Sequence, residues 1–128
     1  MNTKTVLIHG QDTELMAAWA SYLAQDGFAV FTCTDSLEAA EVLSTVNPDF
    51  VVISSNNPAT FLLLGRILRL RRRFPKVVAV TRIHLRMLKL LLEIERFELL
   101  EAPFTFYELK GALRNSYMKP EALQNAYA

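Results

Sequence analysis

Short apolar runs alternate with segments of helical periodicity along almost the whole chain. Each run has five or six residues and is mostly continuous rather than alternating, which is typical of strands buried on both faces of a parallel sheet. Between the runs, apolar residues recur every three or four positions, as in a helix with one buried face. The pattern predicts strands at 5–9, 28–33, 50–54, 77–81 and 98–102. It predicts helices at 12–26, 36–46, 59–74, 83–96 and 106–118.

Strands that alternate with helices through short connections favour one α/β architecture. Right-handed crossovers then lead to a doubly wound, flavodoxin-like (βα)5 fold whose five parallel strands lie in the order 2-1-3-4-5. The 128 residues are enough for one domain. We place that domain at 1–118 and interpret 119–128 as a tail or a truncated linker.

Several residues predict helix ends. Asp35 and Thr105 are each followed three residues later by a glutamate, which is typical of a helix start. Asp12 is expected to help start the first helix. Gly27 is expected to follow the end of that helix.

The composition narrows the cellular setting. The hydrophobic fraction is 52% and the mean hydropathy is +0.19, but no apolar run approaches the ~20 residues that span a bilayer. The first strand begins almost at once, so we expect no signal peptide. The single cysteine, Cys33, cannot form an internal disulfide and fits a reducing cytosol, so we expect a cytoplasmic protein.

In this architecture, ligands bind in the crevice at the carboxyl ends of the strands. Small or polar residues follow several of those ends. They are Gly10, Gln11 and Asp12 after the first strand, Ser54–Asn57 after the third, Thr81 and Arg82 after the fourth, and Glu101 and Ala102 after the fifth.

Three features together resemble the receiver domain of bacterial response regulators. They are "NPDFVVI" at 47–53, Thr81 at the end of the fourth strand and "AP-F" at 102–104, within a five-unit layout that covers about 4–118. The resemblance implies two-component (phosphorelay) signal transduction. It also implies an acid pair that holds Mg²⁺, a phosphate-accepting aspartate, a Thr or Ser, and a Lys before a proline.

The chain departs from that pattern at the reactive positions. The acid pair falls on Gly10 and Gln11, the phosphoacceptor on Ser54 and the lysine on Ala102. Only Thr81 and Pro103, the proline after the lysine position, match the pattern. Phosphoryl transfer needs a metal ion and cations to neutralise charge, and Mg²⁺ needs anionic oxygens. The resemblance is therefore to a degenerate, or pseudo-, receiver that has no enzymatic activity, metal or cofactor.

The fourth helix is apolar around too much of its circumference. At ~100° per residue its apolar side chains cover roughly 220°, whereas a helix packed on one side of a sheet needs an arc of only somewhat over ~100°. In receivers the corresponding face is a usual partner and dimer surface, so we expect a signalling partner or a second copy on the 83–118 face. The candidate interface residues are Leu85, Leu88, Leu91, Leu92, Phe106 and Tyr107.

Charge is unevenly distributed. Nine of the 14 basic residues lie between Arg66 and Lys89, and no acid occurs from Phe50 to Leu92. A helix through this segment places Arg66, Arg69 and Arg73 on one face with Arg72 beside them. This face is a second candidate contact, for an acidic protein or for nucleic acid.

These observations favour a non-catalytic module that acts by phosphorylation-independent protein–protein interaction. Two alternatives remain: a sensor of a small ligand or anion at Ser54–Asn57, and nucleic-acid binding through Arg66–Arg73. His9 and His84 could ligate a metal, but no third ligand or spacing motif supports such a site. Cys33 could have a redox role, but we expect a packed residue at a strand end. No acid–base or nucleophile–base pair can be assembled from the strand ends, which argues against an enzyme.

Overall fold

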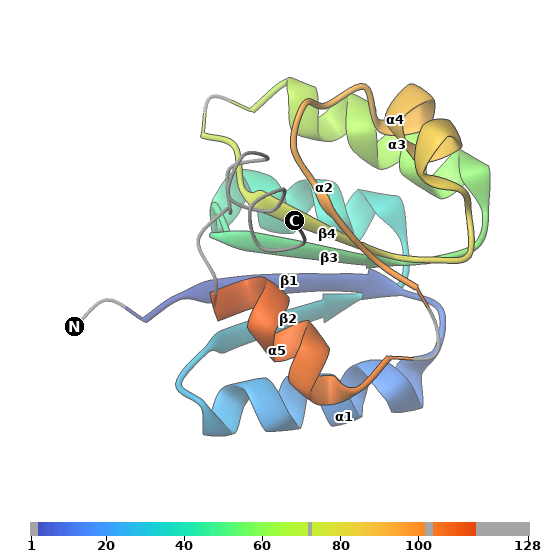
Figure 1. Ribbon diagram of the computed structural model, residues 1–128. Coiled ribbons are helices and arrows are strands. Elements are labelled where there is room, and N and C mark those ends of the chain that lie inside the picture. Colours follow the sequence, from blue (N-terminus) through green and yellow to red (C-terminus); the bar gives the residue numbers. More distant parts are fainter. Residues whose placement is uncertain (1–2, 72, 102–103, 115–128) are drawn as a thin grey trace.

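A computed structural model describes residues 3–71, 73–101 and 104–114. Five parallel strands form one sheet in the predicted order, β2-β1-β3-β4-β5 (Figure 1). The strands are β1 (Thr5–Gly10), β2 (Ala29–Cys33), β3 (Phe50–Ser54), β4 (Lys76–Val80) and β5 (Glu98–Leu100). The expected tail at 119–128 lies outside the described residues.

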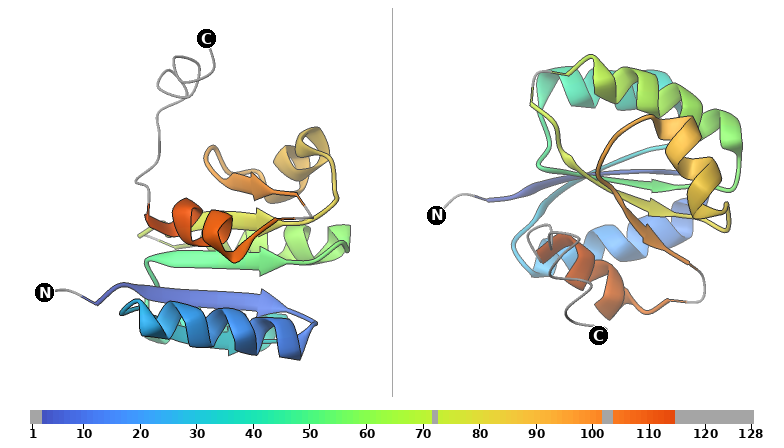
Figure 2. Two further views of the ribbon diagram at one scale, coloured as in Figure 1. Left: turned by 60° about the horizontal axis from the view of Figure 1, so that its bottom comes forward. Right: turned by 45° about the horizontal axis from the view of Figure 1, so that its top comes forward.

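The helices form two layers that enclose the sheet. They are α1 (Thr13–Gln25), α2 (Ser36–Thr45), α3 (Pro58–Arg69), α4 (Leu85–Leu92) and α5 (Phe106–Arg114). Helices α1 and α5 cover one face of the sheet, and α2, α3 and α4 cover the other (Figure 2). The flavodoxin-like (βα)5 fold is therefore confirmed. In the part of the chain that the structure describes, no helix is long and apolar enough to cross a membrane.

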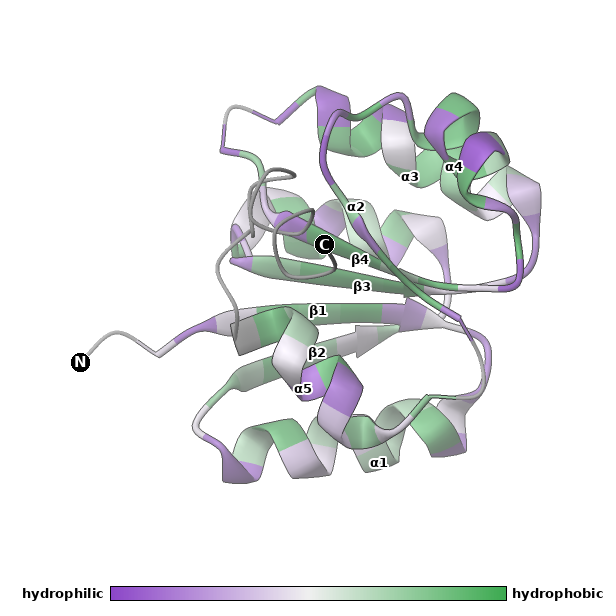
Figure 3. Ribbon diagram, in the orientation of Figure 1, coloured by the Kyte–Doolittle hydropathy of each residue, from purple (hydrophilic) through white to green (hydrophobic). Residues whose placement is uncertain are grey.

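Each face of the sheet has its own core. Leu7, Ile53 and Phe61 belong to the core under α2, α3 and α4, whereas Ile8 and Trp19 belong to the core under α1 and α5. Hydrophobic residues fill the central strands, as Figure 3 shows, because neighbouring residues of one strand alternate between the two cores.

The helix ends that were predicted from single capping residues are confirmed. The side chains of Asp12, Asp35 and Thr105 each accept a hydrogen bond from a backbone N–H three residues later, at 2.8–3.1 Å. Gly27 follows α1 with a φ of 91°, a conformation that glycine adopts without strain.

Two helices are shorter than predicted. Helix α3 ends at Arg69 rather than at residue 74, because Leu70 and Arg71 turn their N–H groups to the carbonyls of Ile67 and Leu68 and tighten the last turn. Helix α4 spans only Leu85–Leu92 instead of 83–96, since Glu93 adopts a left-handed conformation with a φ of 51°.

Helices α3 and α4 touch through their backbones. A Cβ atom on Gly65 would lie 2.6 Å from the carbonyl oxygen of Leu92, so the approach requires glycine. One turn later, Arg69 Nη1 donates to the same oxygen at 2.6 Å, and Nη2 lies 3.6 Å from Glu93 Oε2. Arg69 therefore satisfies a carbonyl at the carboxyl end of α4 and ties that end to α3.

Candidate functional site

The carboxyl ends of β1 and β3 meet in the crevice where the sequence places the lost acids. Gly10 and Ser54 are direct partners in the two strands. A Cβ atom on Gly10 would lie 3.1 Å from Met16 Sδ and 3.3 Å from Ser54 Cβ. Met16 of α1 therefore fills the space beside this strand end, and an acidic side chain at residue 10 would have to displace it.

The next two residues serve the loops rather than a ligand. Gln11 Nε2 donates to the carbonyl oxygen of Thr34 at 2.7 Å and links the loop after β1 to the loop after β2. Asp12 Oδ1 accepts the N–H of Leu15 at 3.0 Å and so starts α1. Asp12 is the only carboxylate of this segment, and the oxygen named here already binds the helix.

Asn56 joins the loop after β3 to the loop after β4. Its Oδ1 accepts from Thr81 Oγ1 at 3.2 Å and from the N–H of Arg82 at 2.8 Å. Thr81 is buried, and its hydroxyl oxygen also accepts the N–H of Ile83 at 3.1 Å. The threonine thus has structural partners on both sides.

The rest of the Ser54–Asn57 loop makes bonds of its own. The N–H of Ser55 donates to Val80 O at 3.1 Å, and Ser55 Oγ accepts the N–H of Asn57 at 3.0 Å. Asn57 Oδ1 accepts the N–H of Ala59 at 3.0 Å and starts α3. These bonds bind the loop to itself and to β4. Ala102, the remaining predicted position, lies outside the described residues.

The two histidines are used differently. His9 is buried between the neighbouring positions Cys33 and Ile53, and neither ring nitrogen has a hydrogen-bond partner among the described residues. Burial lowers the pKa of His9, against a smaller opposing effect of Asp35. His84 instead starts α4, since its Nδ1 accepts the N–H of Arg86 at 3.2 Å.

Cys33 is a packed core residue. It is buried, and its pKa is raised to about 12 by burial first and by Glu38 and Asp35 second. A thiol with this pKa remains protonated and unreactive near neutral pH. Within the described ranges, no group of three or more His, Cys, Asp or Glu side chains could hold a metal ion.

The predicted interface residues divide into two sets. Leu88 and Leu92 are fully buried in the core under α4, so the expectation that they face a partner is wrong. Leu91 is half-buried, and Leu85 is 41% exposed. The helix also exposes residues that the sequence did not single out for an interface: Met87 is 49% exposed and Leu90 70%.

The candidates of α5 lie across the edge of the sheet from α4. Phe106 is half-buried and packs against Tyr22 of α1 in a tilted arrangement, with 4.9 Å between the ring centroids. Tyr107 is 81% exposed. Because α4 and α5 cover opposite faces, the edge strand β5 separates the two sets of candidates (Figure 2).

The expected arginine stripe does not form. Arg69 binds the end of α4, and Arg73 lies beyond the end of α3, where it pairs with Asp49 at 3.4 Å. Arg66 remains exposed on the helix, and Arg72 lies outside the described residues. The stripe is wrong because it assumed that α3 continues to residue 74.

No family model matches the chain, and no curated protein matches it. Solved structures do. A response regulator from Thermotoga maritima is 20% identical with a TM-score of 0.73, covering 88% of this chain and 96% of that one. The chemotaxis protein CheY4 of Vibrio cholerae is 17% identical with a TM-score of 0.74, covering 88% of this chain and 98% of that one. A signal receiver domain from Bermanella marisrubri is 22% identical with a TM-score of 0.72, covering 88% of this chain and 96% of that one.

The chain has the fold of a receiver domain. Gly10 and Ser54, at which the sequence departs from the receiver pattern, meet Asn56 and Thr81 at one end of the sheet. The structure therefore groups the predicted crevice positions that it describes, and it binds the side chains of Gln11, Asn56 and Thr81 to neighbouring loops.

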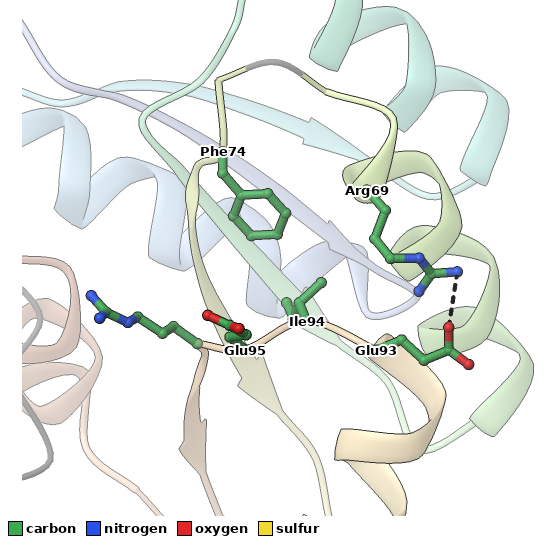
Figure 4. A pocket seen from close by; sticks show the side chains of 6 residues that line it. Arg69, Phe74, Glu93, Ile94 and Glu95 are labelled. Carbon is green, nitrogen blue, oxygen red and sulfur yellow. Dashed lines mark ion pairs between the residues drawn. The ribbon is translucent and has the colours of Figure 1, made fainter.

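A hollow at the opposite end of the receiver fold was not predicted. It has a volume of about 530 Å³ and lies between the end of α3, the segment before β4 and the segment that follows α4. Phe74 and Ile94 point toward each other across it, and Arg69 and Glu93 form one side (Figure 4). The hollow lies next to the carboxyl end of α4, and no periodicity in the sequence indicates that the helix ends at Leu92.

Proposed function

We propose that this chain is a non-catalytic, receiver-like signalling module that binds another protein without phosphoryl control. The receiver fold supports a role in signalling, while the side chains of the crevice argue against phosphoryl transfer. On this proposal the chain is a pseudo-receiver, it acts in the cytoplasm, and its partner is a signalling protein or a second copy.

One observation carries the proposal: the crevice positions where receivers have their reactive acids hold Gly10, Gln11 and Ser54, none of which is an acid. A side chain at Gly10 would press on Met16 Sδ at 3.1 Å, and Ser54 offers a hydroxyl in place of a carboxylate. The only acid of the first loop, Asp12, starts α1. Without anionic oxygens to hold Mg²⁺, a developing phosphoryl charge would have no counter-ion there.

Intact-protein mass measurement after incubation with Mg²⁺ and a small phosphoryl donor tests this proposal. We expect no added phosphoryl group on this chain, while a receiver domain with the complete acid set gains one under the same conditions. The variant Ser54→Asp is a control within the chain. It should also remain unmodified, because the metal-binding acids are still missing. Phosphorylation of the unaltered chain in the crevice would contradict the proposal.

The interaction surface is proposed on either side of the β5 edge, at Leu85 and Leu91 of α4 and at Phe106 and Tyr107 of α5. Their partial or full exposure is the supporting observation. Sedimentation analysis over a range of concentrations tests whether the partner is a second copy. A dimer that Leu85→Glu or Tyr107→Glu dissociates would support self-association, and a monomer at all concentrations would leave a different protein as the partner.

The hollow beside Phe74 favours a second candidate function, the binding of a small ligand. Its volume of about 530 Å³ lies within the range of small-molecule sites, and apolar walls with charged neighbours are typical of such sites. Thermal shifts with a library of amphipathic metabolites would test it. A shift that Phe74→Ala removes would support the function, and no shift with any compound would contradict it.

A further inference from the structure

The solvent side of α4 combines exposed apolar residues with unpaired cations. At ~100° per residue, Arg86, Met87 and Leu90 fall on the side opposite the buried Leu88 and Leu92. No acid occurs within α4 or anywhere from Phe50 to Leu92, and Glu93, which directly follows the helix, lies 3.6 Å from Arg69. We call the exposed residues Arg82, Leu85, Arg86, Met87, Lys89 and Leu90 the α4 outer face.

The cations of this face lack the partners that other basic residues have. Among the described residues, Arg82, Arg86 and Lys89 form no ion pair, whereas Lys110 pairs with Asp26 at 2.8 Å. Exposed cations without counter-charges create a positive potential at the surface. An acidic partner would therefore be attracted to the same area that exposes Met87 and Leu90.

The α4 outer face is held in place before any partner arrives. The backbone contact at Gly65 and the bond from Arg69 to Leu92 fix the carboxyl end of α4 on α3. His84 closes its amino end. A surface that is already ordered loses less entropy on binding, which favours affinity from a small contact.

We propose that the α4 outer face binds an acidic segment of a partner protein that inserts apolar side chains between its own glutamates or aspartates. This inference rests on the proposed function and names the partner's chemistry. Charge complementarity with three unpaired cations selects the acidic character. Exposure of Met87 and Leu90 selects the apolar contacts, which make up the centre of most protein interfaces.

Two other classes of partner fit less well. Nucleic acid would use the cations, but the exposed leucine and methionine would gain nothing from phosphates, and no aromatic residue is present to stack on bases. A membrane-bound helix typically presents a broad apolar face with aromatic residues. At 1.5 Å per residue the eight residues of α4 span only about 12 Å, and aromatic residues are absent from its sequence.

Binding of a designed peptide tests the inference. The probe is a labelled helical peptide with leucines at i, i+3, i+4 and i+7 flanked by glutamates, and fluorescence anisotropy measures its affinity. A matched peptide carries lysines in place of the glutamates. We expect the glutamate peptide to bind, more weakly as salt rises, and the lysine peptide not to bind.

Variants locate the site. Leu90→Glu should lower the affinity for the glutamate peptide by about tenfold or more. Arg86→Glu should lower this affinity and reduce its salt dependence. Leu37→Glu is the matched control, because Leu37 is an exposed leucine of α2 and the substitution changes the charge equally. It should leave the affinity almost unchanged. Circular dichroism confirms that each variant is folded.

Every other pattern overturns the inference. Absence of binding, equal binding of both peptides, or equal loss in Leu37→Glu and Leu90→Glu would each do so. Binding of phosphatidylserine vesicles or duplex DNA through Leu90, without binding of the peptide, would assign a different class of partner. Loss confined to Tyr107→Glu would overturn the α4 outer face but keep the proposed interaction module. The proposed absence of phosphoryl control fails only in the separate mass measurement.

Discussion

The carboxyl-end crevice and the α4 outer face differ in how their side chains are used. In the crevice, Gln11, Asn56 and Thr81 each bind a neighbouring loop. On the outer face, Arg86 and Leu90 contribute no such interaction among the described residues and are exposed. The polar region therefore stabilises the fold, and the surplus apolar and basic side chains are left for another molecule.

The candidate binding site therefore lies on α4 rather than at the ends of the strands. Polar residues at strand ends attract attention in an open α/β sheet, since ligands commonly bind there. Here the side chains of Gln11, Asn56 and Thr81 already form hydrogen bonds within the chain. The exposed Leu90 of α4 is the more informative feature, because it lies away from the core and burying it in a partner would lower the free energy.

The largest effect should separate two leucines of the same helix. Leu88→Ala removes a fully buried side chain and should lower the free energy of unfolding by about 2–5 kcal/mol. Leu90→Ala removes a mostly exposed one and should change it by no more than about 0.5 kcal/mol. Urea unfolding measures both values. Equal losses would mean that Leu90 is also packed and that the outer face does not exist as described.

A pair of glycines tests the contact that holds α4 in place. Gly65→Ala adds a Cβ atom against the backbone of Leu92 and should destabilise the fold by about 1–3 kcal/mol. Gly111→Ala of α5 adds a Cβ atom that meets nothing within 4 Å, so it should stabilise the fold by up to about 1 kcal/mol through helix propensity. A stabilising Gly65→Ala would contradict the close approach of α3 and α4.

Asn56 tests the structural role of the crevice. Asn56→Ala removes the acceptor of two hydrogen bonds and should lower the free energy of unfolding by about 1–2 kcal/mol. Asn56→Asp keeps an oxygen in the same place and should retain most of that stability. If Asn56→Ala unfolds at the same urea concentration as the unaltered chain, the bridge between the two loops contributes nothing.

His9 should produce the smallest effect at neutral pH and a visible one in acid. Burial lowers its pKa in the folded chain below the ordinary 6.5, so the unfolded chain takes up the proton first as the pH falls. The contribution of neutral His9 to stability is thus complete above about pH 6.5 and is lost progressively as the pH falls toward the lowered pKa.

Unfolding free energies measured from about pH 7.5 to about pH 5 would show this slope. His9→Leu should flatten it, whereas a substitution of the exposed His84, His84→Ala, should leave it in place. A slope that persists in His9→Leu would assign the acid sensitivity to carboxylates instead.

Most of the fold could be predicted from the sequence because its signals are local. Continuous apolar runs indicated the strands, and the capping side chains of Asp35 and Thr105 indicated helix starts. The excess of apolar residues on α4 was also visible. Which of its leucines point outward was not, because an apolar arc of more than half a turn fits the sheet in several rotations.

The remaining differences depend on contacts between distant residues. Helix α4 ends where Arg69 binds Leu92, and the arginine stripe is absent because α3 ends at that same Arg69. The hollow beside Phe74 forms because α3 and α4 both end early. The crevice positions could be located from the sequence, but the bond between Asn56 and Thr81 joins residues 25 positions apart and has no local signature.

The bridge from Asn56 to Thr81 and Arg82 also bears on how such a module could be controlled. It ties the segment leading into α4 to the loop after β3. A ligand or modification redirects a protein only by favouring one of two conformations over the other. On our proposal no charge is added at this bridge, so α4 has one position and its outer face is displayed continuously. The number of partners bound would then follow the abundance of the chain, and its synthesis and degradation would set the strength of the signal.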